Sequence, residues 1–294
     1  MSGTGSGERT GGAGRPGGPN RTGVAGEPLL RAESLVKEYA AGRSGPGFRR
    51  GAAVRAVDGI DLEVRPRETV ALVGESGSGK STTARLLLGL EEPTAGRVLW
   101  RGRDIATLDR AGRREFRRCV QVVFQDPFGA LNPRLTVGAM LREVLAVHGL
   151  ARGREAGRRV EELLGLVGLD PAVAARWPHE FSGGQRQRIG IARALSVEPE
   201  LVVCDEPISA LDVSVQAQVL NLLAGLQQRL GLALLFISHD LGVVRHVAAR
   251  TAVMRHGRIV ERGPTADVFA RPQHSYTREL LAARIPLTPA ERAE

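Results

Sequence analysis

Cysteine, aromatic side chains and long apolar runs are scarce in this chain of 294 residues. Its two cysteines, Cys119 and Cys204, are too few and too far apart for a disulfide framework or a metal cluster, which fits a reducing compartment. No apolar run approaches the roughly 18 residues that cross a bilayer, and the start lacks the apolar core of a signal peptide. We therefore expect a chain that stays in the cytosol. Its 42% apolar and 25% charged residues indicate a globular protein long enough for a full enzyme.

Lysine is also scarce, since only Lys37 and Lys80 occur beside 39 arginines. The net charge of +9 has two sources, a surplus of five basic residues in 1–55 and a surplus of four in 101–118. The second stretch contains no aromatic residue except Phe116, whereas grooves for nucleic acid usually stack bases on aromatic rings. Solvated surface or contact with lipid headgroups is therefore favoured, and we expect no nucleic-acid partner.

A glycine-rich segment follows the apolar run 69–73, which is typical of a strand, a loop and the start of a helix. The backbone N–H groups of such a loop point at phosphate and form an anion nest. The ammonium group of Lys80 would reach the outer phosphates, and the hydroxyl of Ser81 would coordinate Mg²⁺. The predicted nucleotide-binding residues of this loop are Gly74, Glu75, Ser76, Gly77, Ser78, Gly79, Lys80, Ser81 and Thr82.

Two adjacent carboxylates end a second apolar run, 201–204. Because side chains alternate along a strand, Asp205 and Glu206 would point in different directions. We expect Asp205 to hold Mg²⁺, directly or through water, and Glu206 to orient and deprotonate the water that attacks the γ-phosphate. A solvated strand end is the alternative interpretation, and the nearby phosphate loop disfavours it.

Three further polar side chains are candidates for the same site, although each has an ordinary explanation when taken alone. Gln125 follows the apolar run 120–124 and could sense both Mg²⁺ and the attacking water. His239 could bond the γ-phosphate and hold Glu206 in place, although a lone histidine is more often an ordinary surface or satisfied residue. Tyr39 offers a ring on which adenine could stack, or it is a core tyrosine.

The order of apolar and glycine-rich segments predicts an α/β protein. Residues 1–28 have almost no large apolar groups, and we expect a disordered leader there. Two strands joined by the Gly- and Arg-rich loop 41–53 predict an antiparallel flap. We expect strands at residues 29–39, 54–64, 69–73, 98–100, 120–124, 201–204 and 233–237, helices at 81–90 and 213–230, and mostly helix over 136–195.

Taken together, the motifs resemble those of ATPase subunits of ATP-binding cassette (ABC) transporters, over about residues 29–284. The glycine-rich loop matches Walker A, Gln125 the Q-loop and His239 the switch histidine. Phe181 stands at the first signature position, where leucine is commonest in the family, and keeps an apolar anchor there. The remaining matches are the signature residues Ser182, Gly183, Gly184 and Gln185, the Walker B run 201–206, and the D-loop 209–212 with Asp212.

The resemblance implies a P-loop NTPase fold, with a RecA-like core, an antiparallel β flap and an inserted α-helical subdomain. On this basis we expect a cassette at 29–262 with a helical subdomain at about 129–195, and a C-terminal extension at 263–294. Three stretches, 123–134, 178–188 and 272–281, are most similar to the second, F-type ATPase of oligopeptide and dipeptide importers. Some members carry a cysteine cluster for iron and sulfur in the tail. This tail has no cysteine, so we expect no cluster.

The resemblance also implies cofactors and partners. The cofactors are ATP and Mg²⁺, and the signature residues contact the ATP held by a second ABC ATPase subunit, in a homodimer or a heterodimer. Two transmembrane permeases and an extracytoplasmic solute-binding protein complete the importer, which places this subunit at the cytoplasmic face of the membrane. Relatives also import nickel, glutathione and oligosaccharides. An ABC ATPase acting on DNA or ribosomes and a small P-loop kinase are disfavoured alternatives, because the chain has one uninterrupted cassette, no Cys-x-x-Cys motif and the SGGQ stretch.

Overall fold

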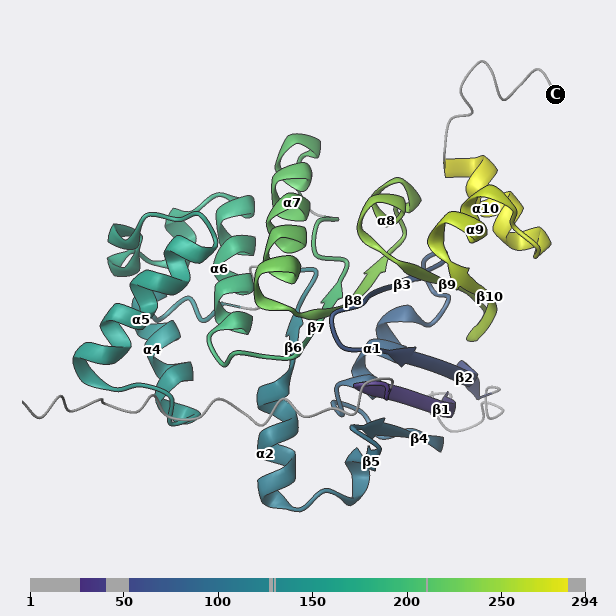
Figure 1. Cartoon of the computed structure of the whole chain (residues 1–294), viewed down its shortest axis with the longest axis horizontal. Coiled ribbons are helices and arrows are strands. Elements are labelled where there is room, and N and C mark those ends of the chain that lie inside the picture. The colour runs from purple at the N-terminus through teal and green to yellow at the C-terminus, as the bar shows by residue number, and fades with distance from the viewer. Residues whose placement is uncertain (1–26, 41–52, 127–128, 130, 210, 285–294) are drawn as a thin grey trace, which may run out of the picture.

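The computed structural model describes residues 27–40, 53–126, 129, 131–209 and 211–284. The expected disordered leader, apart from its last two residues, lies outside the described residues, as does most of the loop 41–53. Two β-sheets and the helices around them make up the described part of the chain (Figure 1).

The smaller sheet has four strands in the order β2-β1-β4-β5. Strand β1 (Leu30–Tyr39) pairs antiparallel with both β2 (Val54–Val64) and β4 (Ala95–Trp100), and β5 (Arg103–Asp104) is a short edge strand. The buried side chains of these strands, Leu35, Ile60 and Trp100 among them, form one core cluster with part of the larger sheet. The expected antiparallel flap is confirmed by this pairing.

The larger sheet has six strands in the order β10-β9-β3-β8-β7-β6. Strands β3, β6, β7, β8 and β9 run parallel, and β10 is antiparallel to β9. Both faces of the parallel strands are covered, which explains their continuous apolar runs. Their bounds are β3 Thr69–Val73, β6 Val120–Val123, β7 Leu201–Asp205, β8 Ala233–Ser238, β9 Arg250–Arg255 and β10 Arg258–Pro264.

The helices fall into three groups (Figure 1). Helices α4 (Val137–Val147), α5 (Gly153–Leu166) and α6 (Gly183–Leu195) pack on one another, with the short 3-10 helices η2 (Pro171–Ala175) and η3 (Pro178–Glu180) between α5 and α6. The second group lies near the sheets and consists of η1 (Ile105–Thr107), α1 (Lys80–Leu87), α2 (Arg110–Cys119), α7 (Val213–Leu230) and α8 (Leu241–Val247). The third group consists of the two C-terminal helices, α9 (Thr265–Ala270) and α10 (Ser275–Arg284). Within the described ranges, none of the helices has both the length and the apolar character that crossing a membrane requires.

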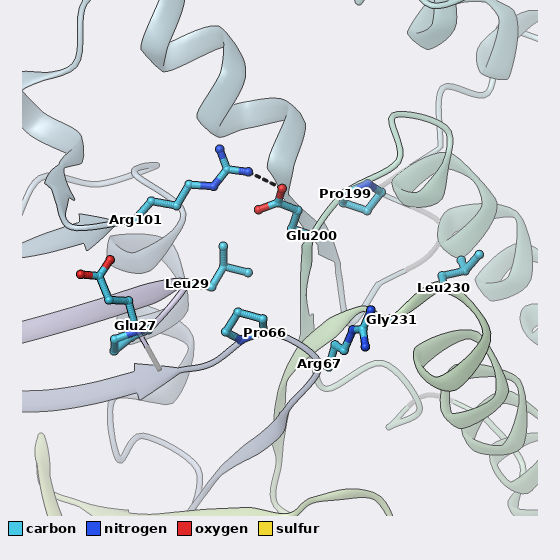
Figure 2. Close-up of a pocket in the computed structure, with 10 residues that line it drawn as sticks. Glu27, Leu29, Pro66, Arg67, Arg101, Pro199, Glu200, Leu230 and Gly231 are labelled. Carbon is cyan, nitrogen blue, oxygen red and sulfur yellow. Dashed lines mark hydrogen bonds and ion pairs between the residues drawn. The ribbon is translucent and has the colours of Figure 1, made fainter. Parts of the chain in front are cut away.

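A small cavity of about 150 Å³ lies at the edge of the larger sheet where β3, β7 and β8 begin (Figure 2). Four apolar side chains line it, namely Leu29 before β1, Pro66 before β3, Pro199 before β7 and Leu230 at the end of α7. One side is closed by a hydrogen-bonded ion pair between Arg101 and Glu200. This edge is opposite to the one at which the glycine-rich loop and the two carboxylates leave the sheet.

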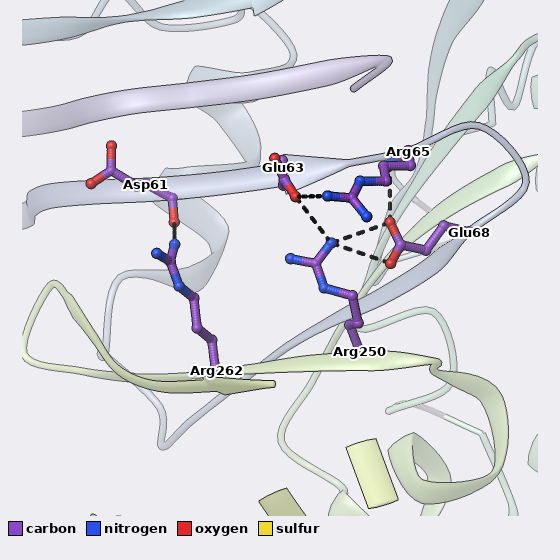
Figure 3. A network of polar contacts seen from close by, with 6 residues as sticks. All are labelled: Asp61, Glu63, Arg65, Glu68, Arg250 and Arg262. Atoms are coloured by element: carbon purple, nitrogen blue, oxygen red, sulfur yellow. Dashed lines mark hydrogen bonds and ion pairs between the residues drawn. The ribbon is translucent and has the colours of Figure 1, made fainter. Parts of the chain in front are cut away.

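A network of charged groups joins the two sheets (Figure 3). The guanidinium of Arg250, at the start of β9, lies 3.5 Å from the carboxylate of Glu63 on β2 and 3.2 Å from that of Glu68. Arg65 pairs with Glu63 at 2.8 Å and donates its backbone N–H to Glu68. Since Glu68 precedes β3, this network fixes the flap against the strand that leads into the phosphate loop.

Candidate nucleotide site

The phosphate loop begins directly after β3, whose five residues are all buried, and ends where α1 begins at Lys80. Gly79 precedes this helix with a φ of 106°, a conformation that side-chain-bearing residues rarely adopt. A Cβ atom on Gly79 would also lie 2.2 Å from the carbonyl oxygen of Ala56 in β2. The glycine therefore lets the loop pass close to the flap and aim the first N–H groups of α1 at an anion.

Lys80 is 5% exposed, and its ammonium group lies inside the curve of its own loop. Nζ donates to the carbonyl oxygens of Gly74, at 2.9 Å, and of Glu75, at 2.8 Å. A buried charge of this kind is stabilised by such acceptors, and an ammonium is well suited to bind phosphate oxygens as a compact positive charge. The predicted role of Lys80 fits this position.

Ser81 and Asp205 come together from α1 and β7, with the serine hydroxyl donating to Oδ1 of the aspartate at 3.2 Å. Burial raises the pKa of Asp205, the hydrogen bond from Ser81 opposes this shift, and the negative charge of Glu206 adds to it. A hydroxyl and a partly buried carboxylate fit Mg²⁺, which binds few protein oxygens and takes its other ligands from phosphate and water. The residues present therefore suit the expected metal.

Glu206 and His239 follow neighbouring parallel strands, β7 and β8, and their side chains meet at this edge of the sheet. Nδ1 of His239 lies 3.2 Å from Oε1 of Glu206. The backbone of Glu206 has a φ of 47°, an uncommon value for a residue other than glycine, and its N–H donates to the carbonyl of Ile237 on β8. Backbone strain of this kind occurs where a fold holds a functional side chain in one direction.

Tyr39 lies at the end of β1, close to the start of α1. Its ring is partly exposed, and its hydroxyl donates to Glu91 at 2.6 Å. Burial and this bond raise the pKa of Tyr39, whereas a hydrogen bond with Thr82 of the phosphate loop lowers it. The structure thus brings the ring to the phosphate loop, on a surface that a base can reach.

Gln125 lies just beyond β6, at the same edge of the sheet as Asp205, because β6 and β7 pair in parallel with Val123 opposite Cys204. The strand ends at Val123, one residue before the expected end, and Gln125 is exposed. The structure thus places Gln125 at the same edge of the sheet as the other candidates.

The signature residues lie at the start of α6, which Figure 1 shows on the other side of β6 and β7 from α1. Ser182 and Gln185 form a reciprocal capping box, in which Oγ of Ser182 accepts from the N–H of Gln185 and Oε1 of Gln185 accepts from the N–H of Ser182. Gly184 is buried, and a Cβ atom there would lie 2.3 Å from Cγ1 of Val215 on α7. Gln185 and Gly184 therefore shape the helix start, whereas Gly183 and the hydroxyl of Ser182 are the groups that a phosphate could approach.

The D-loop connects the carboxylates to α7. Oγ of Ser209 donates to the carbonyl of Glu206 at 3.2 Å, and Nε2 of Gln216 donates to the carbonyls of Ile208 and Leu211. Asp212 is the N-cap residue of α7, but its exposed side chain makes no capping hydrogen bond. Its carboxylate is consequently free of the helix start and faces solvent.

One contact at the loop was not expected from the sequence. The N–H of Glu75 donates to the hydroxyl of Tyr276 at 3.1 Å, across 201 residues. Tyr276 lies in the stretch 272–281, which is notable in the sequence only for its resemblance to importer tails. Nothing in its spacing from the phosphate loop predicts the contact.

The sequence of this chain is similar to sequences of known proteins. The model of the ABC transporter family matches residues 57–209. The glutathione import ATP-binding protein GsiA of Salmonella choleraesuis is 52% identical over 260 residues, which cover 88% of this chain but 42% of the relative, so the chain spans less than half of that protein. A Brucella ovis protein named "Putative peptide import ATP-binding protein" is 49% identical over 91% of this chain and 82% of its own length.

Solved structures lead to the same family. CbiO1 of Clostridium perfringens, part of an ABC transporter complex, has a TM-score of 0.71 and 28% identity, covering 83% of this chain and 91% of its own. The dimeric cassette MJ0796 has a TM-score of 0.69 and 28% identity, covering 81% and 99%. The expected α/β cassette fold is thereby confirmed, and the chain belongs to the ABC transporter family.

Proposed function

We propose that this chain binds and hydrolyses ATP with Mg²⁺ and powers an ABC importer, with peptides as the transported substrate. The observation that carries the proposal is the meeting of five side chains at one edge of the sheet. Lys80 and Ser81 come from the phosphate loop, Asp205 and Glu206 from β7, and His239 from β8. This set supplies a phosphate-binding cation, two metal ligands, a base and a group that positions the base.

The residues divide the work as follows. The loop N–H groups and Lys80 bind the β- and γ-phosphates, and Ser81 and Asp205 hold Mg²⁺, which neutralises charge on the phosphate oxygens. Glu206 orients a water molecule and accepts its proton as the oxygen attacks the γ-phosphorus. The bond from that phosphorus to the β-γ bridging oxygen then breaks, and ADP leaves with its electron pair. His239 holds the side chain of Glu206 in its orientation. Gln125 connects the site to helices α4, α5 and α6.

One chain holds two half-sites rather than one whole site. Because the signature lies apart from the phosphate loop, Ser182, Gly183 and Gly184 would close on ATP held by a second cassette, with Asp212 at the same contact. The solved cassette MJ0796 is described as dimeric, including a post-hydrolysis form with ADP and Pi, which supports this arrangement. The γ-phosphate would favour closure, and its loss would reverse it. The second subunit is either an identical or a homologous cassette.

Import and its substrate class follow from the relatives. Their names describe peptide import and glutathione import, so two permeases and a solute-binding protein are the partners proposed here, and the chain would act at the cytoplasmic face of the membrane. Glutathione is itself a small peptide and is the second candidate substrate. A role on DNA or ribosomes has no observation in its favour among the relatives described.

Co-purification tests the proposal. The tagged chain is isolated from detergent-solubilised membranes, its partners are identified by mass spectrometry, and ATPase activity is measured with and without Mg²⁺. We expect two permeases, a second cassette and Mg²⁺-dependent turnover. Recovery of ribosomes or DNA-repair proteins instead would contradict the importer, and absence of ATP turnover in the intact complex would contradict the motor.

A further inference from the structure

The two C-terminal helices reach the phosphate loop through one side chain. Tyr276, the second residue of α10, is 2% exposed, and its hydroxyl accepts the hydrogen bond from the N–H of Glu75 at 3.1 Å. The guanidinium of Arg255, the last residue of β9, covers the tyrosine ring at 4.6 Å from its centroid. The hydroxyl is therefore directed at the loop by a packed ring and not by a mobile side chain.

The bond bears on Lys80 through a single peptide unit. The N–H of Glu75 and the carbonyl of Gly74 belong to the same planar peptide, whose two polar groups point in nearly opposite directions. Tyr276 binds one end of this unit, and Nζ of Lys80 binds the other at 2.9 Å. Fixing the N–H thus fixes the direction of the carbonyl that holds the lysine ammonium group.

The peptide unit between Gly74 and Glu75 is closely packed against β9 on one side. A Cβ atom on Gly74 would lie 2.2 Å from the carbonyl oxygen of Met254 in β9. Glycine is needed for that close approach, but glycine also leaves the peptide easier to rotate than any other residue would. The hydroxyl of Tyr276 supplies the restraint that the missing side chain does not.

The start of α10 is itself fixed to the sheet. The carboxylate of Glu261 on β10 accepts from the N–H groups of Gln273, at 2.8 Å, and His274, at 3.0 Å. Nδ1 of His274 accepts from the N–H of Tyr276 at 3.1 Å. A chain of bonds consequently runs from β10 through the C-terminal helix to the phosphate loop.

We propose that Tyr276 is a positioning residue for the phosphate loop, through which the C-terminal helices set the affinity of the site for nucleotide phosphates. This inference rests on the proposed ATP-binding function and extends it. Because coupling between two sites is reciprocal, nucleotide on the loop should also stabilise the start of α10. A ligand or partner of the C-terminal helices would thereby change nucleotide affinity without entering the nucleotide site.

The first test measures binding of Mg²⁺-ADP to the full chain by isothermal titration calorimetry. ADP is the probe because it occupies the loop without the γ-phosphate that would drive closure. In Tyr276→Phe the ring and its packing on Arg255 are kept and only the acceptor is lost. One net hydrogen bond corresponds to about three- to tenfold weaker binding.

The matched control is Thr265→Val, which removes a buried hydroxyl from the same C-terminal region. Thr265 is 2.8 Å from Thr251, oxygen to oxygen, and this pair does not touch the phosphate loop. We expect a similar loss of thermal stability in both variants but unchanged ADP affinity in Thr265→Val. Equal affinities of the Tyr276→Phe and Thr265→Val proteins would overturn the inference. Absence of nucleotide binding by the wild-type chain would overturn the proposed function itself.

Amide hydrogen exchange provides a second test. If the role of Tyr276 were purely structural, its replacement would not change the protection that ADP gives to the C-terminal helices. Saturating Mg²⁺-ADP should slow exchange over residues 272–284 in the wild-type and Thr265→Val proteins. In Tyr276→Phe, with ADP raised to the same saturation, this protection should be lost while protection of the phosphate loop persists. Equal protection of 272–284 in all three proteins would contradict the coupling.

Discussion

Nδ1 of His239 lies 3.2 Å from Oε1 of Glu206, although the two residues are separated by 33 positions in the sequence. The register of the parallel strands produces the contact, because Asp205 on β7 is paired with Ile237 on β8. The segments after β7 and β8 therefore leave the sheet side by side. Glu206 directly follows β7, and His239 directly follows β8. The pairing of β7 and β8 thus holds both Glu206 and His239 in place. Its register is fixed, because a shift by one residue would turn buried side chains to the opposite face of the sheet.

Replacing Glu206 by Gln should stop turnover and leave nucleotide binding intact. The amide keeps the shape of the side chain but cannot accept a proton from water, which costs on the order of a hundredfold to ten-thousandfold in kcat. ATPase assays and ATP titrations of the same preparation measure the two effects. Glu198→Gln is the control, because Glu198 also has a positive φ, of 53°, and pairs with Arg159 away from the site. Near-normal turnover in Glu206→Gln would contradict the assignment of the base.

Replacing Gly184 by Ala should reduce both stability and ATPase activity, because the new Cβ would overlap Cγ1 of Val215 and push α6 away from α7. The double variant Gly184→Ala, Val215→Ala removes the obstacle and should regain most of both properties, as followed by thermal unfolding and ATP turnover. Gly190→Ala on the same helix meets no neighbouring atom and should stabilise the protein by roughly 0.5–1 kcal/mol. If the double variant recovers stability but not turnover, Gly184 contributes to phosphate binding and not only to packing.

Much of the fold could be predicted because its strands are short apolar runs that end in polar motifs. The strand Val54–Val64 and the helix Val213–Leu230 have the expected bounds, and the antiparallel pairing of the flap is confirmed. Helix α2 and the hairpin of β9 and β10 were not among the expected elements. Arginine makes up half of α2, whose large apolar side chain is Phe116 alone, and β10 has no fully buried residue, so both have few of the apolar side chains on which such predictions depend.

The candidate site was predictable to the extent that its residues belong to local motifs. Lys80 and Ser81 begin the helix after the glycine-rich loop, Asp205 ends β7, and Glu206 and His239 directly follow β7 and β8, so the sheet brings all five together at one edge. The roles of Gln185 in the capping box and of Tyr276 at the phosphate loop depend on side-chain directions and on contacts between distant segments, which no local pattern contains. The domain boundaries and the roles assigned to single site residues stay predictions until the variants are measured.

Replacing Arg250 by Ala should loosen the flap from the larger sheet. The side chain is less than one-third exposed and lies between the carboxylates of Glu63 and Glu68, which would then repel each other across the junction. Hydrogen bonds to charged groups of this kind contribute about 1.5–3 kcal/mol each before solvent screening, so a loss of roughly 1–2 kcal/mol is expected. Urea denaturation measures it, and Arg271→Ala is the control, since Arg271 forms an exposed pair with Asp267. Equal stability of the two variants would contradict a junction held by Arg250.

Cys119 should resist alkylation in the folded protein. Burial first, and the negative charge of Glu200 second, raise the pKa of this thiol to about 11, so at pH 8 only about one thiol in a thousand is the reactive thiolate. Cys204 is fully buried in β7. Mass spectrometry after iodoacetamide treatment should find both thiols unmodified in buffer and both modified in urea. Rapid modification of Cys119 in buffer would show that α2 opens readily.

Two variants of Tyr39 distinguish stacking of a base from hydrogen bonding, because one removes only the hydroxyl and the other removes the ring as well. Tyr39 is 37% exposed beside the phosphate loop, and its hydroxyl binds Glu91. If adenine stacks on the ring, Tyr39→Phe should bind ATP almost normally, whereas Tyr39→Ala should lose about 1–3 kcal/mol of binding free energy. Calorimetry with ATP and with inorganic tripolyphosphate, which has no base, distinguishes the two contributions. Tripolyphosphate affinity should be unchanged in both variants, because the phosphates are held by the loop and Lys80. If Tyr39→Ala weakens tripolyphosphate as much as ATP, the ring supports the fold of the loop through Thr82 and does not bind the base.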